Sequence, residues 1–303
     1  MGLNRYSYRV LITVVIIIIC SFGIQLLVGA ENQEYKIIDD LGREIRVDLP
    51  IKSIISTAPS NTEILFALGL GEKVFGVTEE CNYPPEAKAK PKIGQVEMSI
   101  EKIIETSPDL VISVASMQMP IIEALSDLSI PVLAVDPKTV EDVLNNIILI
   151  GKATGTEEVA GLLAEDLGNQ IRDIQIKAAK AVEEGGRPRV FVEIWDEPLM
   201  TAGPGTFIDE LITIAGGENI AWDSAVEWPE FSTEVLIERN PEVIITVWAD
   251  ENDILTRPAW KYVSACKTGR IRKLNPDFLT RPGPRLIQGL SELLEAIHPD
   301  YFS

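Results

Sequence analysis

The segment SIEKIIETSPDLVIS, residues 99–113, occurs a second time in the chain as STEVLIERNPEVIIT, residues 232–246, and the two copies align without a gap. Each copy starts with a serine suited to cap a helix N-terminus, followed by a glutamate in the first turn, where it complements the helix dipole. An apolar face of about two turns and a proline complete the helix pattern. The short apolar run that follows predicts a buried parallel strand. Two copies of one helix–strand unit predict two lobes of similar build.

Strand and helix patterns alternate around both copies. Before the first copy, the sequence predicts a peripheral hairpin around Leu41–Gly42, then a strand, a helix and a second strand. Ser60 and Glu63 have the spacing of a capping box, which predicts that they begin this helix together. The second half is expected to contain further strands and helices at 189–195, 205–217, 270–275 and 284–297. Such alternation is typical of parallel sheets with helices on their faces.

A long helical pattern separates the two halves. From Thr139 to about Glu184 the apolar residues recur at helical spacing without a strand. A helix of about thirty residues measures about 40 Å, which is enough to pass from one lobe to another. We therefore predict an α/β fold of two similar lobes, each with a mainly parallel sheet and flanking helices, joined by one long rigid helix. The expected division is an N-terminal lobe at 31–140, a helical connector at 141–186 and a C-terminal lobe at 187–303.

The first thirty residues are typical of an export signal. Two arginines precede an apolar run from Val10 to Val28, and small residues up to Ala30 suit a signal peptidase. The run is long enough to remain as a membrane anchor instead. Lipid attachment at Cys20 is not expected, because the bulky Ile19 precedes it. We expect residues 1–30 to be a signal peptide or N-terminal anchor of a protein exported to the periplasm or the outer face of the cytoplasmic membrane.

Composition excludes several classes of protein. The formal net charge of -19 argues against binding to nucleic acid or to an anionic membrane surface. Cys81 and Cys266 fall in opposite halves, so they indicate no disulfide framework, and we assign them no role. Zinc and manganese sites use imidazoles and carboxylates, and the one histidine, His298, lies beyond the last expected helix. No metal site is expected.

Catalytic motifs are missing from the sequence. It contains no GxSxG, HExxH or GxxxxGK[ST] motif, and no GxGxxG after a strand. With one histidine, acid–base catalysis would rest on carboxylates, and no pair of them stands out among so many. We expect a protein that is not an enzyme. A structural or adhesive role is the remaining alternative to ligand binding.

A series of segments, in order through residues 51–297, resembles the substrate-binding proteins of bacterial importers for vitamin B12, iron-siderophores and haem. The segments are TAPSNTEILFALGLG, GVTEECNYPPEA, SIEKIIETSPDLVIS, TAGPGTFIDELITIAGGENI, EWPEFSTEVL and DFLTRPGPRLIQGL. The resemblance implies two α/β lobes joined by a long helix and a ligand held in the cleft between them. It also implies that both lobes dock on a permease dimer powered by ATP hydrolysis.

The resemblance gives the repeated glutamate a function. In this family a surface glutamate on each lobe pairs with arginines of the permease, and Glu101 and Glu234 match those positions. The alternative is that each glutamate only complements its helix dipole, which is worth about 0.3–1 kcal/mol. Two copies at equivalent places favour docking.

The resemblance also implies ligand contacts. Trp228, Asp277 and Arg281 match a cleft aromatic and a polar loop of the B12-binding member. Trp195, at the end of the first strand of the second lobe, is a further candidate, although both tryptophans have an alternative role as hydrophobic plugs. Aromatic walls suit a flat, largely apolar macrocycle with amide arms. We therefore expect a corrinoid, cobalamin, as the transported ligand, and no resident cofactor.

One position departs from the B12-binding pattern. Glu80 stands where that member has a stacking tyrosine, and Tyr83 is expected to belong to the YPP turn or to contact the ligand, in principle as an axial ligand of haem. Anionic siderophores need several basic groups, and few besides Arg281 stand in the expected cleft loops. Arg285 is expected to cap structure around the final helix. Ferric siderophore and haem are therefore the alternative ligands.

Overall fold

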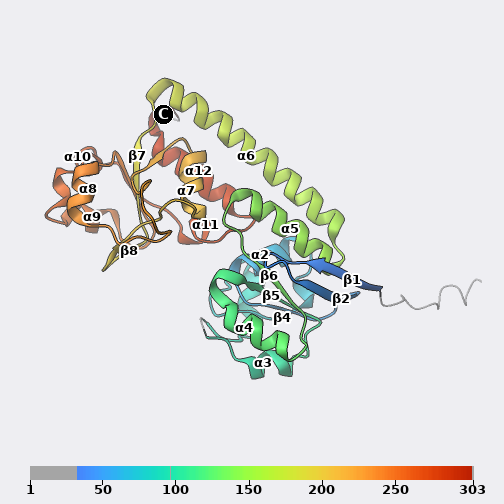
Figure 1. Ribbon diagram of the computed structural model, residues 1–303. Helices are drawn as coiled ribbons and strands as arrows, with labels where there is room; N and C mark the ends of the chain where they lie inside the picture. Colours follow the sequence, from blue (N-terminus) through green and yellow to red (C-terminus); the bar gives the residue numbers. More distant parts are fainter. Residues whose placement is uncertain (1–32, 96, 302–303) are drawn as a thin grey trace, which may run out of the picture.

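The computed structural model describes residues 33–95 and 97–301, which form two α/β lobes (Figure 1). The predicted leader at 1–30, with Cys20, lies outside the described residues. Among those described, no helix has the length and apolarity needed to cross a membrane.

The N-terminal lobe begins with the predicted hairpin, in which β1 (Gln33–Ile38) pairs antiparallel with β2 (Glu44–Leu49). Behind it lies a parallel sheet in the order β4-β3-β5-β6. Its strands are β3 (Ile54–Ser56), β4 (Val74–Gly76), β5 (Leu110–Val114) and β6 (Val132–Val135). Its helices are α2 (Pro59–Ala67), α3 (Ile100–Glu105) and α4 (Ala115–Asp127), with short 3-10 turns at Gly71–Lys73 and Pro85–Ala89.

The C-terminal lobe contains a second parallel sheet in the order β10-β7-β11-β12. Its strands are β7 (Arg189–Glu193), β10 (Glu218–Asn219), β11 (Val243–Thr246) and β12 (Ile271–Lys273), and β8 (Trp195–Asp196) and β9 (Leu199–Met200) form a separate small hairpin. Its helices are α7 (Phe207–Ile214), α8 (Thr233–Arg239), α9 (Glu251–Thr256), α10 (Ser264–Thr268), α11 (Pro276–Leu279) and α12 (Leu286–Ile297), with 3-10 turns at Trp260–Tyr262 and Pro299–Tyr301.

The two sheets have the same topology. In each, the first strand along the chain lies between the second and the third, and the fourth forms the edge beside the third. The repeated segments supply equivalent parts, α3 with β5 and α8 with β11. Ser99 and Ser232 cap these helices as predicted, accepting hydrogen bonds from the amides of Lys102 and Val235 at 3.2 Å. The predicted similarity of the two lobes is confirmed.

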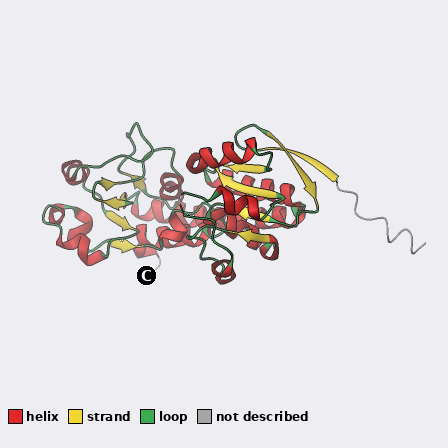
Figure 2. Cartoon of the chain, turned by 90° about the horizontal axis from the view of Figure 1, so that it is seen from below, coloured by secondary structure: helices red, strands yellow, loops and turns green. Residues whose placement is uncertain are grey.

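Two helices connect the lobes, α5 (Val140–Thr154) and the 29-residue α6 (Glu157–Gly185), which runs along one side of the molecule (Figure 1). Figure 2, from below, shows the two sheets at opposite ends with helices between them. One face of α6 is buried along its whole length, from Ala160 to Ala181, and joins a hydrophobic core shared by both lobes. Helix α5 contacts both lobes, and α6 packs on α5 and on α7 and α12 of the C-terminal lobe. The domain boundaries at 140 and 186 remain a prediction.

The start of α2 differs from the prediction. The helix begins at Pro59 with Ala58 as the N-cap residue, and no side chain caps it. The predicted capping box of Ser60 and Glu63 is therefore wrong. The carboxylate of Glu63 instead faces the other lobe, where it accepts hydrogen bonds from two guanidinium groups.

Candidate ligand-binding site

The carboxyl ends of the two sheets face each other. Parallel strands place their carboxyl ends at one edge of a sheet, so the loops that follow them lie together. Two of these loops in the N-terminal lobe contact two in the C-terminal lobe. The Lys138 ammonium lies 3.6 Å from a Glu227 carboxylate oxygen, and the Asn82 amide donates to Asp277 at 3.2 Å. We call the surface formed by the loops after the strands the interlobe face.

Exposed tryptophans mark this edge of the C-terminal lobe. Four of the five tryptophans follow the carboxyl ends of β7, β10 and β11: Trp195, Trp222, Trp228 and Trp248, which are 53%, 65%, 45% and 58% exposed. The fifth, Trp260, is buried. Indole rings are rarely left in water without a function, and a group of them suits a large apolar ligand. The sequence prediction named Trp195 and Trp228 and missed Trp222 and Trp248, of which only Trp248 follows a strand that the sequence predicts.

The N-terminal lobe contributes a different surface. Helix α4 is kinked at Gln118, whose φ is −137°. The Gln118 side chain donates to the Thr57 carbonyl at 2.7 Å and accepts from the Val114 amide at 3.1 Å, so it ties the loop after β3 to the end of β5. Beside it, Met117 is 77% exposed and lines a cavity of about 380 Å³ with Met98, Ile100, Pro120 and Ile121. The N-terminal lobe therefore presents methionine side chains, whereas the C-terminal lobe presents tryptophan side chains.

A cluster of two arginines and two carboxylates joins the lobes. The Arg285 guanidinium donates to both oxygens of Glu63, at 2.6 and 2.9 Å, and Arg281 donates to Glu63 at 3.2 Å. Arg281 also lies 2.8 Å from Asp277. The Glu63 side chain is 2% exposed and each arginine 11%. Hydrogen bonding to Glu63 is the main cause that raises the pKa of Arg285. Asp277 and Arg281, two of the predicted ligand contacts, thus lie together in an ion cluster. Their contact with a ligand stays a prediction.

Tyr83 lies at the side of this cluster. Its ring is half exposed, and the Arg285 guanidinium lies 4.2 Å from the ring centroid, in the geometry of a cation–π contact. Arg285 is the N-cap residue of α12, but its side chain makes no capping hydrogen bond, because a guanidinium has no acceptor for the helix amides. Glu80 accepts from the Gln95 amide at 2.7 Å, and its carbonyl accepts from Arg281 at 3.2 Å. Of the five predicted ligand residues, Tyr83, Asp277 and Arg281 therefore form one group, and Trp195 and Trp228 belong to the exposed tryptophans.

The two predicted docking glutamates are exposed in the first turns of their helices, Glu101 in α3 and Glu234 in α8. A hydrogen bond from its own backbone amide, and a second from the Ser99 hydroxyl at 3.0 Å, lower the pKa of Glu101. Figure 1 shows α3 and α8 in different lobes, both on the side of the molecule away from α6. This placement presents one acidic helix start per lobe.

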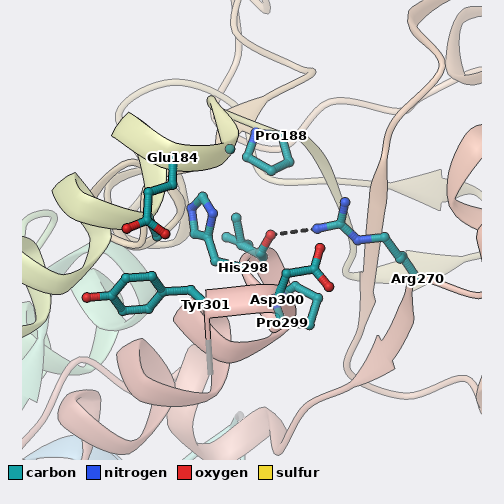
Figure 3. A pocket seen from close by; sticks show the side chains of 10 residues that line it. Glu184, Pro188, Arg270, His298, Pro299, Asp300 and Tyr301 are labelled. Atoms are coloured by element: carbon teal, nitrogen blue, oxygen red, sulfur yellow. Dashed lines mark hydrogen bonds between the residues drawn. The ribbon is translucent and has the colours of Figure 1, made fainter. Parts of the chain in front are cut away.

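A second cavity, of about 260 Å³, lies at the far end of the C-terminal lobe (Figure 3). Pro188 and Arg270 line it and precede β7 and β12, so it opens at the amino edge of the sheet, opposite the interlobe face. His298 and Glu184 also line it, from the ends of α12 and α6. Within residues 33–95 and 97–301, no group of three or more histidine, cysteine, aspartate or glutamate side chains could hold a metal ion.

The sequence profile of the periplasmic binding proteins matches residues 54–278, from β3 into α11. The chain belongs to the periplasmic binding protein family. Among the relatives of this periplasmic binding protein, the uncharacterized ABC transporter substrate-binding lipoprotein YvrC of Bacillus subtilis is 37% identical over 272 residues, 88% of this chain and 86% of the relative. The vitamin B12-binding protein of Pectobacterium atrosepticum is 31% identical over 244 residues, 79% of this chain and 86% of the relative.

Solved structures of periplasmic binding proteins share the fold. The vitamin B12-binding protein BtuF of Vibrio cholerae has a TM-score of 0.74 and 29% identity over 82% of this chain and 97% of its own. The haem-binding protein RhuT of Roseiflexus sp. RS-1 has a TM-score of 0.75 and 28% identity over 82% of this chain and 99% of its own. Substrate-binding proteins of ABC transporters are not enzymes, and neither is this periplasmic binding protein. Its relatives include B12 and haem binders alike.

Proposed function

We propose that the protein is an exported substrate-binding protein that captures a corrinoid, cobalamin, between its lobes and delivers it to an ABC permease dimer. The observation that carries the proposal is the group of four exposed tryptophans at the carboxyl edge of the C-terminal sheet. A corrin ring is broad and largely apolar, and its amide arms carry no charge. Indole faces bury such a ring, and a few polar groups at the edge suffice to orient it.

The charges of the interlobe face support a ligand without several negative groups. In the described part of this face, four basic side chains near the strand ends already have carboxylate partners. Lys138 pairs with Glu227, Lys273 with Asp250, and the two arginines of the cluster with Glu63 and Asp277. A multiply anionic siderophore would have to displace these carboxylates, which costs the hydrogen bonds they accept.

Haem is the alternative ligand with an observation in its favour. Tyr83 is half exposed beside Arg285, and a tyrosine oxygen is a known axial ligand of haem iron. Proteins named for haem binding also share the fold. Arg281 and Arg285 are already paired with Glu63 and Asp277. This disfavours haem, because its propionate groups need cations that have no carboxylate partner.

The location follows from the relatives and the leader. Relatives are named as periplasmic proteins or lipoproteins, so we place this protein in the periplasm or on the outer face of the cytoplasmic membrane. Its first thirty residues act as a signal peptide or as an anchor.

Calorimetric titration of the exported protein with cyanocobalamin tests the ligand, with haem and a ferric siderophore titrated in parallel. We expect one-to-one binding of cyanocobalamin alone. Trp228→Ala should weaken it by roughly tenfold or more, because removing a buried aromatic contact costs about 1.4 kcal/mol or more.

Tyr262→Ala is the matched control, since Tyr262 is 59% exposed on the 3-10 turn before α10. Helix α10 contacts the Pro241 carbonyl, at the amino end of β11 and away from the strand carboxyl ends. The affinity of this variant should equal that of the wild type. Heat from haem or the siderophore with none from cyanocobalamin would keep the importer function and replace the corrinoid. No heat with any of the three would contradict the proposed function.

A further inference from the structure

Glu63 is a buried carboxylate whose partners all belong to the other lobe. It projects from α2 of the N-terminal lobe, and both of its oxygens accept hydrogen bonds from arginines of the segment between α11 and α12. The same segment approaches α2 closely, since a Cβ added at Gly283 would lie 3.6 Å from the Ser60 Cα. The contact is therefore a packed interface with a charge pair at its centre.

Local structure does not explain this pair. Glu63 does not cap α2, and Arg285 stands at the N-terminus of α12, where the positive end of the helix dipole disfavours a cation. Arg285 is stabilised there by Glu63 and, at 3.5 Å, by Asp277. The Arg285 guanidinium is unfavourable for its own helix, and its shortest contacts, at 2.6 and 2.9 Å, cross to Glu63 of the other lobe. This arrangement indicates a role in holding the lobes together.

Arg281 depends on the N-terminal lobe for its orientation. It donates to Glu63 at 3.2 Å, to the Asn82 side chain at 2.8 Å and to the Glu80 carbonyl at 3.2 Å. Its partner within its own lobe is Asp277, at 2.8 Å. Moving the lobes apart removes all three contacts with the N-terminal lobe at once.

We propose that Glu63 is the N-terminal half of a latch between the lobes and a positioning residue for Arg281, so that opening the lobes dismantles the polar end of the ligand site. The role of Arg281 toward the ligand rests on the proposed function, whereas the latch itself does not. Separation of the lobes by a permease then has two effects. It widens the space between the lobes, and it frees the guanidinium that orients the ligand, so release follows opening without a further signal.

The latch is tested first without ligand. Glu63→Gln keeps the shape of the side chain and removes its charge. Asp39→Asn is the matched control, because Asp39 is a buried carboxylate that binds Arg43 at 2.6 and 3.0 Å within one lobe. In hydrogen–deuterium exchange of the full chain, Glu63→Gln should speed exchange at 79–83 and at 277–285, in both lobes. Asp39→Asn should speed exchange around the hairpin and β6 alone, because Asp39 also accepts a hydrogen bond from the Ala134 amide at 3.3 Å. Wild-type exchange at 79–83 and 277–285 in Glu63→Gln would overturn the latch.

The positioning role is tested by the kinetics of cyanocobalamin binding, followed by tryptophan fluorescence in stopped flow. Glu63→Gln should raise the dissociation rate constant by about tenfold or more and leave the association rate constant unchanged, because breaking a buried charge pair acts on the bound state. Asp39→Asn should change neither constant. If the wild type binds cyanocobalamin and Glu63→Gln has the same dissociation rate constant, the positioning role is overturned and the proposed function stays intact. A wild-type that does not bind would contradict the proposed function, while the exchange experiment still decides the latch.

If Glu63→Gln does not fold, Asn82→Ala replaces it in both experiments. Asn82 is exposed, so its removal leaves no buried charge, and Arg281 still loses a contact of 2.8 Å with the N-terminal lobe. Faster exchange at 277–285 and faster release of cyanocobalamin are expected. Wild-type values for both would overturn the proposal.

Discussion

At the scale of single residues, His298 lies where α7 and α12 of the C-terminal lobe meet the connecting helix α6. It is buried after α12, and a Cβ added at Gly216, just after α7, would lie 2.8 Å from its Nε2 atom and 2.9 Å from a Val182 methyl of α6. Burial is the main cause that lowers the pKa of His298, and the positive charges of Arg270 and Arg187 add to it. The carbonyls of 215 and 216 oppose the shift without cancelling it. The fold therefore favours the neutral imidazole.

This shift predicts a pH dependence of stability. Between the lowered pKa and the ordinary value of 6.5, the unfolded chain binds more protons than the folded chain, so the free energy of unfolding rises with pH. The contribution of the neutral His298 side chain to the free energy of unfolding is fully present above pH 6.5 and is lost as the pH falls below that value. Urea unfolding of the wild type and of His298→Gln between pH 5 and 8 measures this effect. The variant should gain stability relative to the wild type as the pH falls, and a constant difference would contradict the prediction.

Burial of carboxyl groups acts in the opposite direction. Burial raises the pKa of Glu193 and of Glu210. The stability that these two groups contribute is therefore fully present below the ordinary pKa of 4.5 and is lost as the pH rises above it. These groups titrate in both the wild type and His298→Gln. The comparison of the two proteins therefore isolates the histidine.

At the scale of elements, the crossing of α5 and α6 requires a glycine. A Cβ added at Gly151 would lie 2.3 Å from the Cβ of Ala160, whereas one added at Gly161 meets nothing within 4 Å. Gly151→Ala should therefore destabilise the protein by about 1–3 kcal/mol through overpacking. Gly161→Ala should stabilise it by about 0.4–1 kcal/mol, because alanine has less conformational freedom to lose in a helix. Urea unfolding of both variants checks the pair, and effects of the same sign would contradict it.

Elements fixed by neighbouring residues were predictable from the sequence. Ser99 and Ser232 cap helices through amides only three positions away, so the local pattern was sufficient. Ser60 and Glu63 showed an equally good local pattern, and the prediction was wrong. The partners of Glu63 lie more than two hundred positions along the chain, and no local rule describes a carboxylate bound by residues of another lobe.

The candidate site was predictable in part for the same reason. Tryptophans after strand ends are visible in the sequence where the strand is clear, as for Trp195 after β7. Strand β10 has two residues, too few for a periodic pattern, and Trp222 after it was missed. Trp248 follows the predicted strand β11, so its place at a strand end was visible in the sequence, but no segment of the family resemblance marked it as a ligand contact.

At the scale of the whole molecule, the shared core limits how the lobes move. The main hydrophobic core includes residues of both sheets, of α5 and of α6, so the lobes are packed together along one side. Opening must then occur on the side away from α6, and it must break the Glu63 cluster and the Lys138–Glu227 pair, which also join the lobes. That is also the side on which α3 and α8 present their glutamates (Figure 1). A partner that binds both helices is thus placed to act on the contacts that hold the lobes together.

Docking through these helices predicts a specific loss of transport. The double variant Glu101→Arg and Glu234→Arg should bind cyanocobalamin as the wild type does, and uptake by the host cell should be abolished, because like charges would then face the arginines that the family resemblance implies on the permease. A cation at a helix N-terminus costs about 0.3–1 kcal/mol, too little to unfold a protein of ordinary stability. Glu105→Arg with Glu238→Arg is the matched control, since both residues are exposed on the same two helices near their C-terminal ends. Uptake should persist in the control, where the dipole favours the new cations. Normal uptake by the first double variant, or loss of uptake in both, would contradict docking through the helix starts.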